Sequence, residues 1–291
     1  MSGVSAFELE GGIALALARG LSVAALLSAY GALLFRVTVA PPVLDRMGVG
    51  EFDRRWRILF WGSWSAVIIA TLAWLALQAA SMASAQDVLE TASAIPTVLA
   101  DTSFGHLLLL RLLVLLVAAL VLGRGGRLRL WVATGLAALA TGLQGAHSHA
   151  AAMYDGPSFL LLSQVVHLLA AGAWLGGLLP LLLLIAVAPA NAPVLASRRF
   201  SPMATLCVLL LAITASFQFW VLIEGLPGLI GTGYGRMALA KAGLFIALLG
   251  FASYNRFRLT PALLGPSAAI AKHRLYRSIA VETAVGLLVV L

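Results

Sequence analysis

The stretch Phe159–Val187, FLLLSQVVHLLAAGAWLGGLLPLLLLIAV, decides the fold class of this chain. Its one ionisable side chain is His167, and as an α-helix it exceeds the roughly 20 apolar residues that cross a bilayer core. The rest of the chain is similar, since 62% of its 291 residues are hydrophobic and 10% are charged. This composition predicts a polytopic membrane protein, with one transmembrane domain over residues 1–291 and almost nothing outside the bilayer.

Apolar runs of this kind recur along the chain and predict an all-α bundle of eight transmembrane helices. The expected spans are Gly12–Val39, Ile58–Ala80, Phe104–Leu122, Leu130–Ala146, Phe159–Val187, Met203–Ile223, Met237–Tyr254 and Leu275–Leu291. The residues before Gly12 lack the basic region of a signal peptide, so we expect the first run to be a helix of the mature protein. Gly172 and Gly176 form a small-xxx-small pair that is expected to let the fifth helix pack closely, with Trp174 between them as a packing residue.

The basic residues predict the orientation of the bundle. Most of the 19 Lys and Arg fall in the loops that follow odd-numbered spans. The positive-inside rule places these loops in the cytoplasm and both termini on the outer side of the membrane. The net charge of +8 is therefore an orientation signal, and lipid is the expected partner rather than nucleic acid. We find no nucleophile–base pair and no nucleotide motif, so no enzymatic activity is expected.

Two short sequence matches indicate an internal repeat. Thr102–Arg111 (TSFGHLLLLR) and Thr232–Lys241 (TGYGRMALAK) share Thr, an aromatic residue, Gly, Leu and a final cation, and Arg54-Arg55-Trp56 matches Arg198-Arg199-Phe200. They predict two parallel four-helix units, roughly residues 1–146 and 158–291, related by an axis along the membrane normal. A functional centre is then expected between the units, or one site per unit with only one kept.

Four of the five histidines map to the outer half of the expected spans. His106 opens the third span, His147 and His149 end the fourth, His167 lies about 12 Å inside the fifth, and Met153 is in the loop between. An ionisable side chain at the depth of His167 is costly unless it faces the bundle interior or a cavity. Imidazole and thioether ligands together favour copper, although histidines also collect at membrane interfaces for polarity alone. If the fourth helix ends by Ala146, His147 and His149 can share one ion.

The run Val166–Leu181 resembles the copper resistance protein D (CopD) family of bacterial inner-membrane proteins. So do the segments Ser148–Ala152, Arg198–Ser201, Tyr234–Lys241 and Asn255–Pro261. The resemblance implies an eight-helix protein of copper resistance or homeostasis that moves copper from periplasm to cytoplasm, often beside a periplasmic copper-binding protein. His149 and His167 match the family's histidines, whereas His106 and His147 rest on their spacing alone.

A copper path also needs weaker copper-binding sites nearer the cytoplasm. Cys207 and Met203 are the soft groups expected in the cytoplasmic half, although a lone cysteine is equally a small core residue. Because Cys207 is the only cysteine, an internal disulfide and a multi-cysteine metal cluster are excluded.

Buried charges leave other functions open. Arg19, Arg111 and Lys241 lie in the outer half of their spans, where they could pair with acids, snorkel to the surface or hold haem propionates. The second hypothesis is therefore a b-type haem redox protein, with His167 and either His106 or His149 as axial ligands. Glu282 in the last helix is a proton or ion relay, or a partner for an arginine. The third hypothesis is a copper-binding sensor or scaffold without transport.

Overall fold

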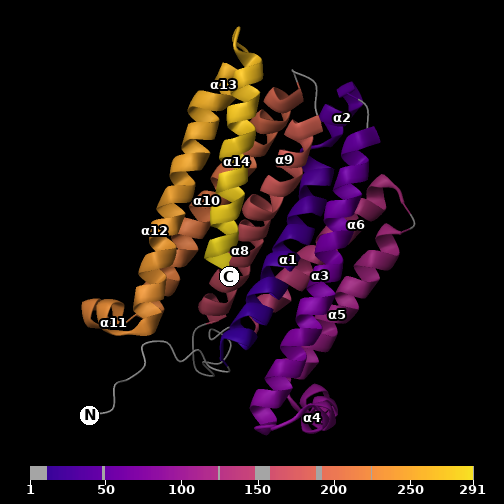
Figure 1. Ribbon diagram of the computed structural model, residues 1–291, viewed down its shortest axis with the longest axis vertical. Helices are drawn as coiled ribbons and strands as arrows, with labels where there is room; N and C mark the ends of the chain where they lie inside the picture. The colour runs from indigo at the N-terminus through magenta and orange to yellow at the C-terminus, as the bar shows by residue number, and fades with distance from the viewer. Residues whose placement is uncertain are drawn as a thin grey trace.

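The computed structural model describes residues 12–47, 50–123, 125–147, 158–187, 192–223 and 225–290. These residues form helices and their connections with no strand among them, which confirms the all-α expectation. The long helices run side by side, with α4 and α11 at one end of the bundle and α2 and α13 at the other (Figure 1). We call these the α4 end and the α13 end.

Every expected span coincides with a long helical stretch. In chain order the helices are α1 (Gly12–Thr38), α2 (Pro41–Met47), α3 (Gly50–Ala83), α4 (Val88–Asp101), α5 (Ser103–Leu122), α6 (Arg127–Gly145), α8 (Ser158–Ala171), the π-helix η1 (Gly172–Gly176), α9 (Gly177–Val187), α10 (Ala192–Leu222), α11 (Gly225–Gly231), α12 (Gly233–Tyr254), the π-helix η2 (Asn255–Leu259), α13 (Thr260–Ala262) and α14 (Ala268–Val290). The short helices α2, α4 and α11 occupy segments that the sequence predicts as loops. Helices α3 and α10 begin well before the expected spans. Helix α3 extends into a charged first turn, and α10 begins with the apolar turn Ala192–Leu195 ahead of Arg198 and Arg199.

Six helical stretches in the described part of the chain are long and apolar enough to cross a membrane. They are Gly12–Thr38, Gly50–Ala83, Ser103–Leu122, Phe159–Val187, Ala192–Leu222 and Gly233–Ala262. The chain is therefore a multi-pass membrane protein. Helices α6 and α14 are not among the six, and α14 carries three cations and a carboxylate. The expected number of eight crossings stays a prediction.

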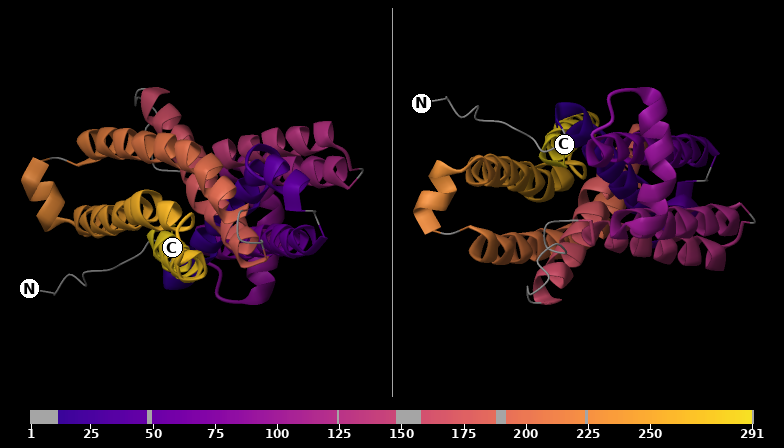
Figure 2. Two further views of the ribbon diagram at one scale, coloured as in Figure 1. Left: turned by 90° about the horizontal axis from the view of Figure 1, so that it is seen from above. Right: turned by 90° about the horizontal axis from the view of Figure 1, so that it is seen from below.

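Helix α1 is the centre of the packing, because α3, α6, η1 and α9 all pack against it. The close approach depends on glycine: a Cβ on Gly31 of α1 would overlap the backbone of Gly172 and Gly176, and one on Gly176 would overlap the carbonyl of Leu27. The expectation that Gly172 and Gly176 let this helix pack closely is confirmed. Helices α10, α11 and α12 project to one side of this centre, and α3, α5 and α6 lie on the other (Figure 2).

The two matched threonine segments build the same turn. Thr102 begins α5 and Thr232 begins α12, and each hydroxyl accepts a hydrogen bond of 3.0 Å from the backbone N–H of the glycine three residues on, Gly105 or Gly235. Each hydroxyl also donates to a carbonyl four residues earlier at 2.6 Å. A Cβ on either glycine would overlap the short helix before the turn, α4 or α11. This local identity supports the repeat, while the parallel arrangement of two whole units stays a prediction.

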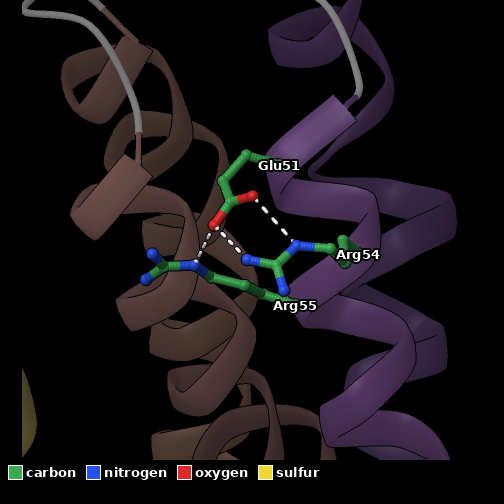
Figure 3. A network of polar contacts seen from close by, with 3 residues as sticks. All are labelled: Glu51, Arg54 and Arg55. Atoms are coloured by element: carbon green, nitrogen blue, oxygen red, sulfur yellow. Dashed lines mark hydrogen bonds and ion pairs between the residues drawn. The ribbon is translucent and has the colours of Figure 1, made fainter.

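The second matched pair is less alike in structure. Figure 3 shows Glu51, in the first turn of α3, accepting hydrogen bonds from Arg54 (2.9 and 3.1 Å) and Arg55 (2.7 Å). The corresponding position before Arg198 is Leu195, so α10 has no acid there. These exposed pairs hold the charged start of α3 in helical form at the α13 end, where they contribute modestly.

Candidate functional site

His167 projects from α8 and is held in one orientation by α10. Its Nδ1 lies 2.9 Å from Oγ1 of Thr214. The Thr214 hydroxyl also lies 2.7 Å from the carbonyl of Leu210, and when it donates to that carbonyl it accepts from the imidazole. In that arrangement the proton of His167 is on Nδ1. This leaves Nε2 unprotonated, with a lone pair that suits a metal ion.

Further polar side chains extend this contact between α8 and α10. The Ser163 hydroxyl donates to the Thr214 carbonyl at 3.4 Å, and Gln218 Nε2 donates to the Ser163 hydroxyl at 3.3 Å. Lys241 of α12 is close enough to act electrostatically on His167. A cation bound to His167 would therefore meet one positive charge from that side. Thr214, Ser163 and Gln218 were not predicted from the sequence. They could have been noticed as polar residues inside otherwise apolar runs.

His147 follows α6, which ends at Gly145 with Ala146 as its C-cap, as expected. The ring packs against Trp74 and Phe104, with centroids 5.3 and 5.4 Å apart. Its Nε2 is 3.4 Å from the Phe104 carbonyl, to which it donates, and its buried Nδ1 has no hydrogen-bond partner among the described residues. The imidazole is thus fixed by aromatic packing, with Nδ1 as the acceptor atom.

His106 has a local structural role. Its side chain is exposed in the first turn of α5, and its Nε2 donates to the carbonyl of Ala100 near the end of α4 at 2.6 Å. The haem hypothesis, with His167 and either His106 or His149 as axial ligands, stays a prediction.

His149 and Met153 lie outside the described residues, so the shared site of His147, His149 and Met153 stays a prediction. Among the residues that the structure does describe, no three His, Cys, Asp or Glu side chains are close enough to hold one metal ion. A three-ligand site made of these residue types would need a member from beyond that part of the chain.

Arg111 is completely buried, with 0% of its surface exposed, so the expectation that it could snorkel to the surface is wrong. Its Nη2 donates to Thr71 of α3 at 3.0 Å and to Ser22 of α1 at 3.4 Å, and the guanidinium lies 5.4 Å from the ring centroid of Trp74. Nε and Nη1 have no hydrogen-bond partner in the part of the chain that the structure describes. The two hydroxyls and the indole face draw the side chain inward, where it acts electrostatically on His147.

The other two cations differ from Arg111. Lys241 is exposed on α12, which agrees with snorkelling, and Arg19 is half-buried on α1 and also acts electrostatically on His147. A metal cation at His147 would therefore be opposed by Arg19 and Arg111. Of the described histidines, His167 offers the better supported position for a cation.

Cys207 and Met203 belong to the packed core. Cys207 is buried next to Tyr30 of α1, and Met203 packs against the same cluster. Neither residue lines the cavity described next, and their place on a path stays a prediction.

Glu282 of α14 is 2% exposed and lies at a cavity of about 330 Å³ in the α13 half of the bundle. Asn255 Nδ2 donates to its Oε2 at 2.8 Å, and the indole of Trp174 also hydrogen-bonds its carboxyl. Trp174 was expected only to pack, and Asn255 was missed although it stands at the start of a charged segment. The pairing of Glu282 with an arginine, which the sequence left open, is not among the ion pairs of the described residues.

Comparison with known families gives two matches. A family described as "Copper resistance protein D" matches residues 194–291, and one described as "Copper resistance protein D-like, N-terminal domain" matches residues 9–159. Neither match covers His167 of α8, nor η1 and α9, which lie between the two matched segments. No curated protein and no solved structure matches the chain significantly.

Proposed function

Because the chain belongs to the copper resistance protein D family, we propose that it moves copper across the bacterial inner membrane, from periplasm to cytoplasm. The α4 end would face the periplasm, since the basic loops gather at the α13 end. In this proposal copper is the cargo, and the protein is a permease rather than an enzyme. A periplasmic copper-binding protein is the proposed donor.

The observation that carries the proposal is the hydrogen bond between His167 and Thr214. It fixes the tautomer and the ring orientation of a histidine inside a membrane helix, as neighbours of metal ligands commonly do. Ionisable groups at this depth mark ion or substrate pathways more often than packing. His147, with His149 and Met153, would capture copper at the entrance, and His167 would receive it further in.

The first experiment is metal analysis with an absorption spectrum on the purified protein, before and after copper loading. We expect near-stoichiometric copper without a Soret band, lost in His149→Ala and His167→Ala. The matched control is His273→Ala, because His273 is exposed near the α13 end and has no part in the proposed path. Equal copper binding by His167→Ala and the wild type would show that His167 is not part of the copper site. Iron with a Soret band would show that the histidines hold haem, and the copper proposal would then be wrong.

Copper flux into proteoliposomes separates a permease from a sensor or scaffold. The proposal expects copper to accumulate inside vesicles that contain the wild type and the His273→Ala variant. Copper binding without accumulation in both would show that the protein holds the ion but does not carry it.

A further inference from the structure

Glu282 is a carboxyl group that the proposed copper path does not use. It is almost fully buried in α14, and the groups that contact it are neutral hydrogen-bond donors, the amide of Asn255 and the indole of Trp174. No cation forms an ion pair with it among the described residues. A buried carboxylate without a positive partner is costly, so a mobile cation has to balance it for part of the time.

The cavity beside Glu282 provides room for water. Its volume of about 330 Å³ exceeds by far the roughly 30 Å³ that one water occupies in the liquid. Two other polar atoms of residues that line it, Oδ1 of Asn255 and Oγ of Ser197, are buried without a protein partner. Buried polar atoms are nearly always hydrogen-bonded, so these two atoms indicate that water enters the cavity.

The same cavity reaches the α13 end of the bundle. Arg256 of η2 also lines it, is exposed, and donates a hydrogen bond to Thr205 of α10. A chain of water molecules between Arg256 and Glu282 would connect the carboxyl with the solvent at that end. The carboxyl therefore has an access route that does not pass His167.

Two π-helices bring the neighbours of Glu282 into place. Trp174 lies in η1 and Asn255 opens η2, and each π-helix interrupts a long helix at the level of the cavity. Such local widening costs regular hydrogen bonding and is found frequently at functional sites. Both interruptions here supply a donor to the same carboxyl, which a purely structural role of Glu282 does not require.

Few other ionisable side chains lie where they could exchange protons with the cavity beside Glu282. Helices α9, α13 and η1, which pack against α14, carry no titratable side chain. The titratable or charged side chains on the remaining neighbours are Arg19, Tyr30 and Arg36 on α1, Tyr234, Arg236, Lys241 and Tyr254 on α12, and Arg256 and Arg258 on η2; those of α14 itself are Lys272, His273, Arg274, Tyr276 and Arg277. Of all these, Arg256 alone lines the cavity with Glu282.

We propose that Glu282 binds and releases a proton through this cavity, and that the proton leaves when copper enters the path. The second half rests on the proposed function. The carboxylic acid gives its proton to water in the cavity and becomes a carboxylate, and the reverse step restores it. A copper cation in the bundle favours the carboxylate by electrostatic attraction, so copper entry and proton release are linked, and linkage is reciprocal.

Infrared spectroscopy tests the proton site without any transport. The purified protein is titrated with acid and base, and the absorption of protonated carboxyl groups is recorded for the wild type, Glu282→Gln and the control Asp87→Asn. Asp87 is an exposed acid that caps α4, and Asn is also a good N-cap, so this variant keeps its fold. We expect a titrating band that the control retains and Glu282→Gln lacks. An identical band in all three proteins would overturn the proton site.

Proton release on copper entry is then measured in proteoliposomes with an internal pH dye and an internal copper indicator. The wild type should acidify the compartment at its α13 end as copper enters, and Glu282→Gln should lose this release, because the amide has no proton to give. Glu282→Asp should restore part of it. Normal copper uptake without proton release would overturn the coupling and leave the permease intact. Absence of copper uptake in the wild type would overturn the proposed function and with it the coupling, while the infrared result still decides whether Glu282 is a proton site.

Discussion

Thr214 of α10 accepts a hydrogen bond from Nδ1 of His167 on α8, across 2.9 Å. This direction follows when Thr214 donates its own proton to the Leu210 carbonyl, 2.7 Å away. One hydroxyl thus determines which nitrogen of a membrane-embedded imidazole can bind a metal ion. This relationship gives the first test of the copper path.

Replacing Thr214 by Val should weaken copper binding at His167 by about 10-fold to 100-fold, the usual effect of removing a neighbour that orients a metal ligand. Valine has nearly the same shape but cannot accept a hydrogen bond, so the imidazole loses its fixed tautomer. Copper affinity is measured by competition with a chromophoric chelator. Thr214→Ser is the matched control and should bind as the wild type does. Equal affinity of the Val and Ser variants would show that Thr214 does not orient a ligand.

Thr71→Val should lower the stability of the protein by about 1–3 kcal/mol, because it leaves the buried Arg111 guanidinium with one hydroxyl fewer. Arg111→Met should be close to neutral or stabilising, since two of the guanidinium nitrogens already lack partners. Thermal unfolding in detergent provides the measurement.

The double variant Thr71→Val with Arg111→Met separates the two contributions. In the methionine background Thr71→Val should cost little, since no buried charge then depends on the hydroxyl. If Thr71→Val is as costly there as in the wild type, its effect comes from packing and not from Arg111.

Gly31→Ala should destabilise the bundle strongly, because its Cβ would overlap the backbone of η1 where α1 crosses it. Overpacking of a close-packed interior costs about 1–3 kcal/mol, and here backbone would have to move. Gly62→Ala in α3 is the control, since nothing lies within 4 Å of a Cβ at that position. It should gain roughly 0.5–1 kcal/mol from helix propensity. Equal unfolding temperatures of the two variants would contradict the close approach of α1 and η1.

The long helices could be predicted from hydropathy, because crossing a bilayer needs continuous apolar residues. The true start of α3 could not, since charged turns such as the one with Glu51 continue a helix into water without any apolar signal. Nor could that of α10, because Arg198 and Arg199 separate its apolar first turn from the long apolar run. Helices α4 and α11 could not be predicted from hydropathy for a related reason. They are short and include Pro96 or lie among glycines, so their stability depends on packing against α5 and α12.

The sequence predicted how far His167 lies along its apolar helix, but not which side chains it contacts. The position of His167 within an apolar run already marks it as a candidate for function. Its partner Thr214 is far along the chain, and its contact with His167 depends on the rotation of α10, which hydropathy does not determine. The error on Arg111 has the same origin, because the sequence gives the depth of the cation but not the hydroxyls of Ser22 and Thr71 that face it.

The orientation and the number of crossings can be tested with single cysteines, because the native Cys207 is buried and can be replaced by Ala. Ala85→Cys lies between α3 and α4 at the α4 end, and Ser267→Cys lies before α14 at the α13 end. An impermeant maleimide should label Ala85→Cys from the periplasm. Ser267→Cys should react only after the inner membrane is opened, since the basic loops predict a cytoplasmic α13 end.

Helix α14 decides whether the count of eight holds, because its charges set it apart from the six clear spans. If α14 crosses the membrane, Val290→Cys near its end should react from the periplasm, on the opposite side from Ser267→Cys. Its buried Glu282 and its packing against α9 and α12 favour this outcome, because they draw the charged helix into the bundle. Labelling of Val290→Cys and Ser267→Cys from the same side would mean that α14 does not cross. The Glu282 cavity would then need an access route other than the one through Arg256.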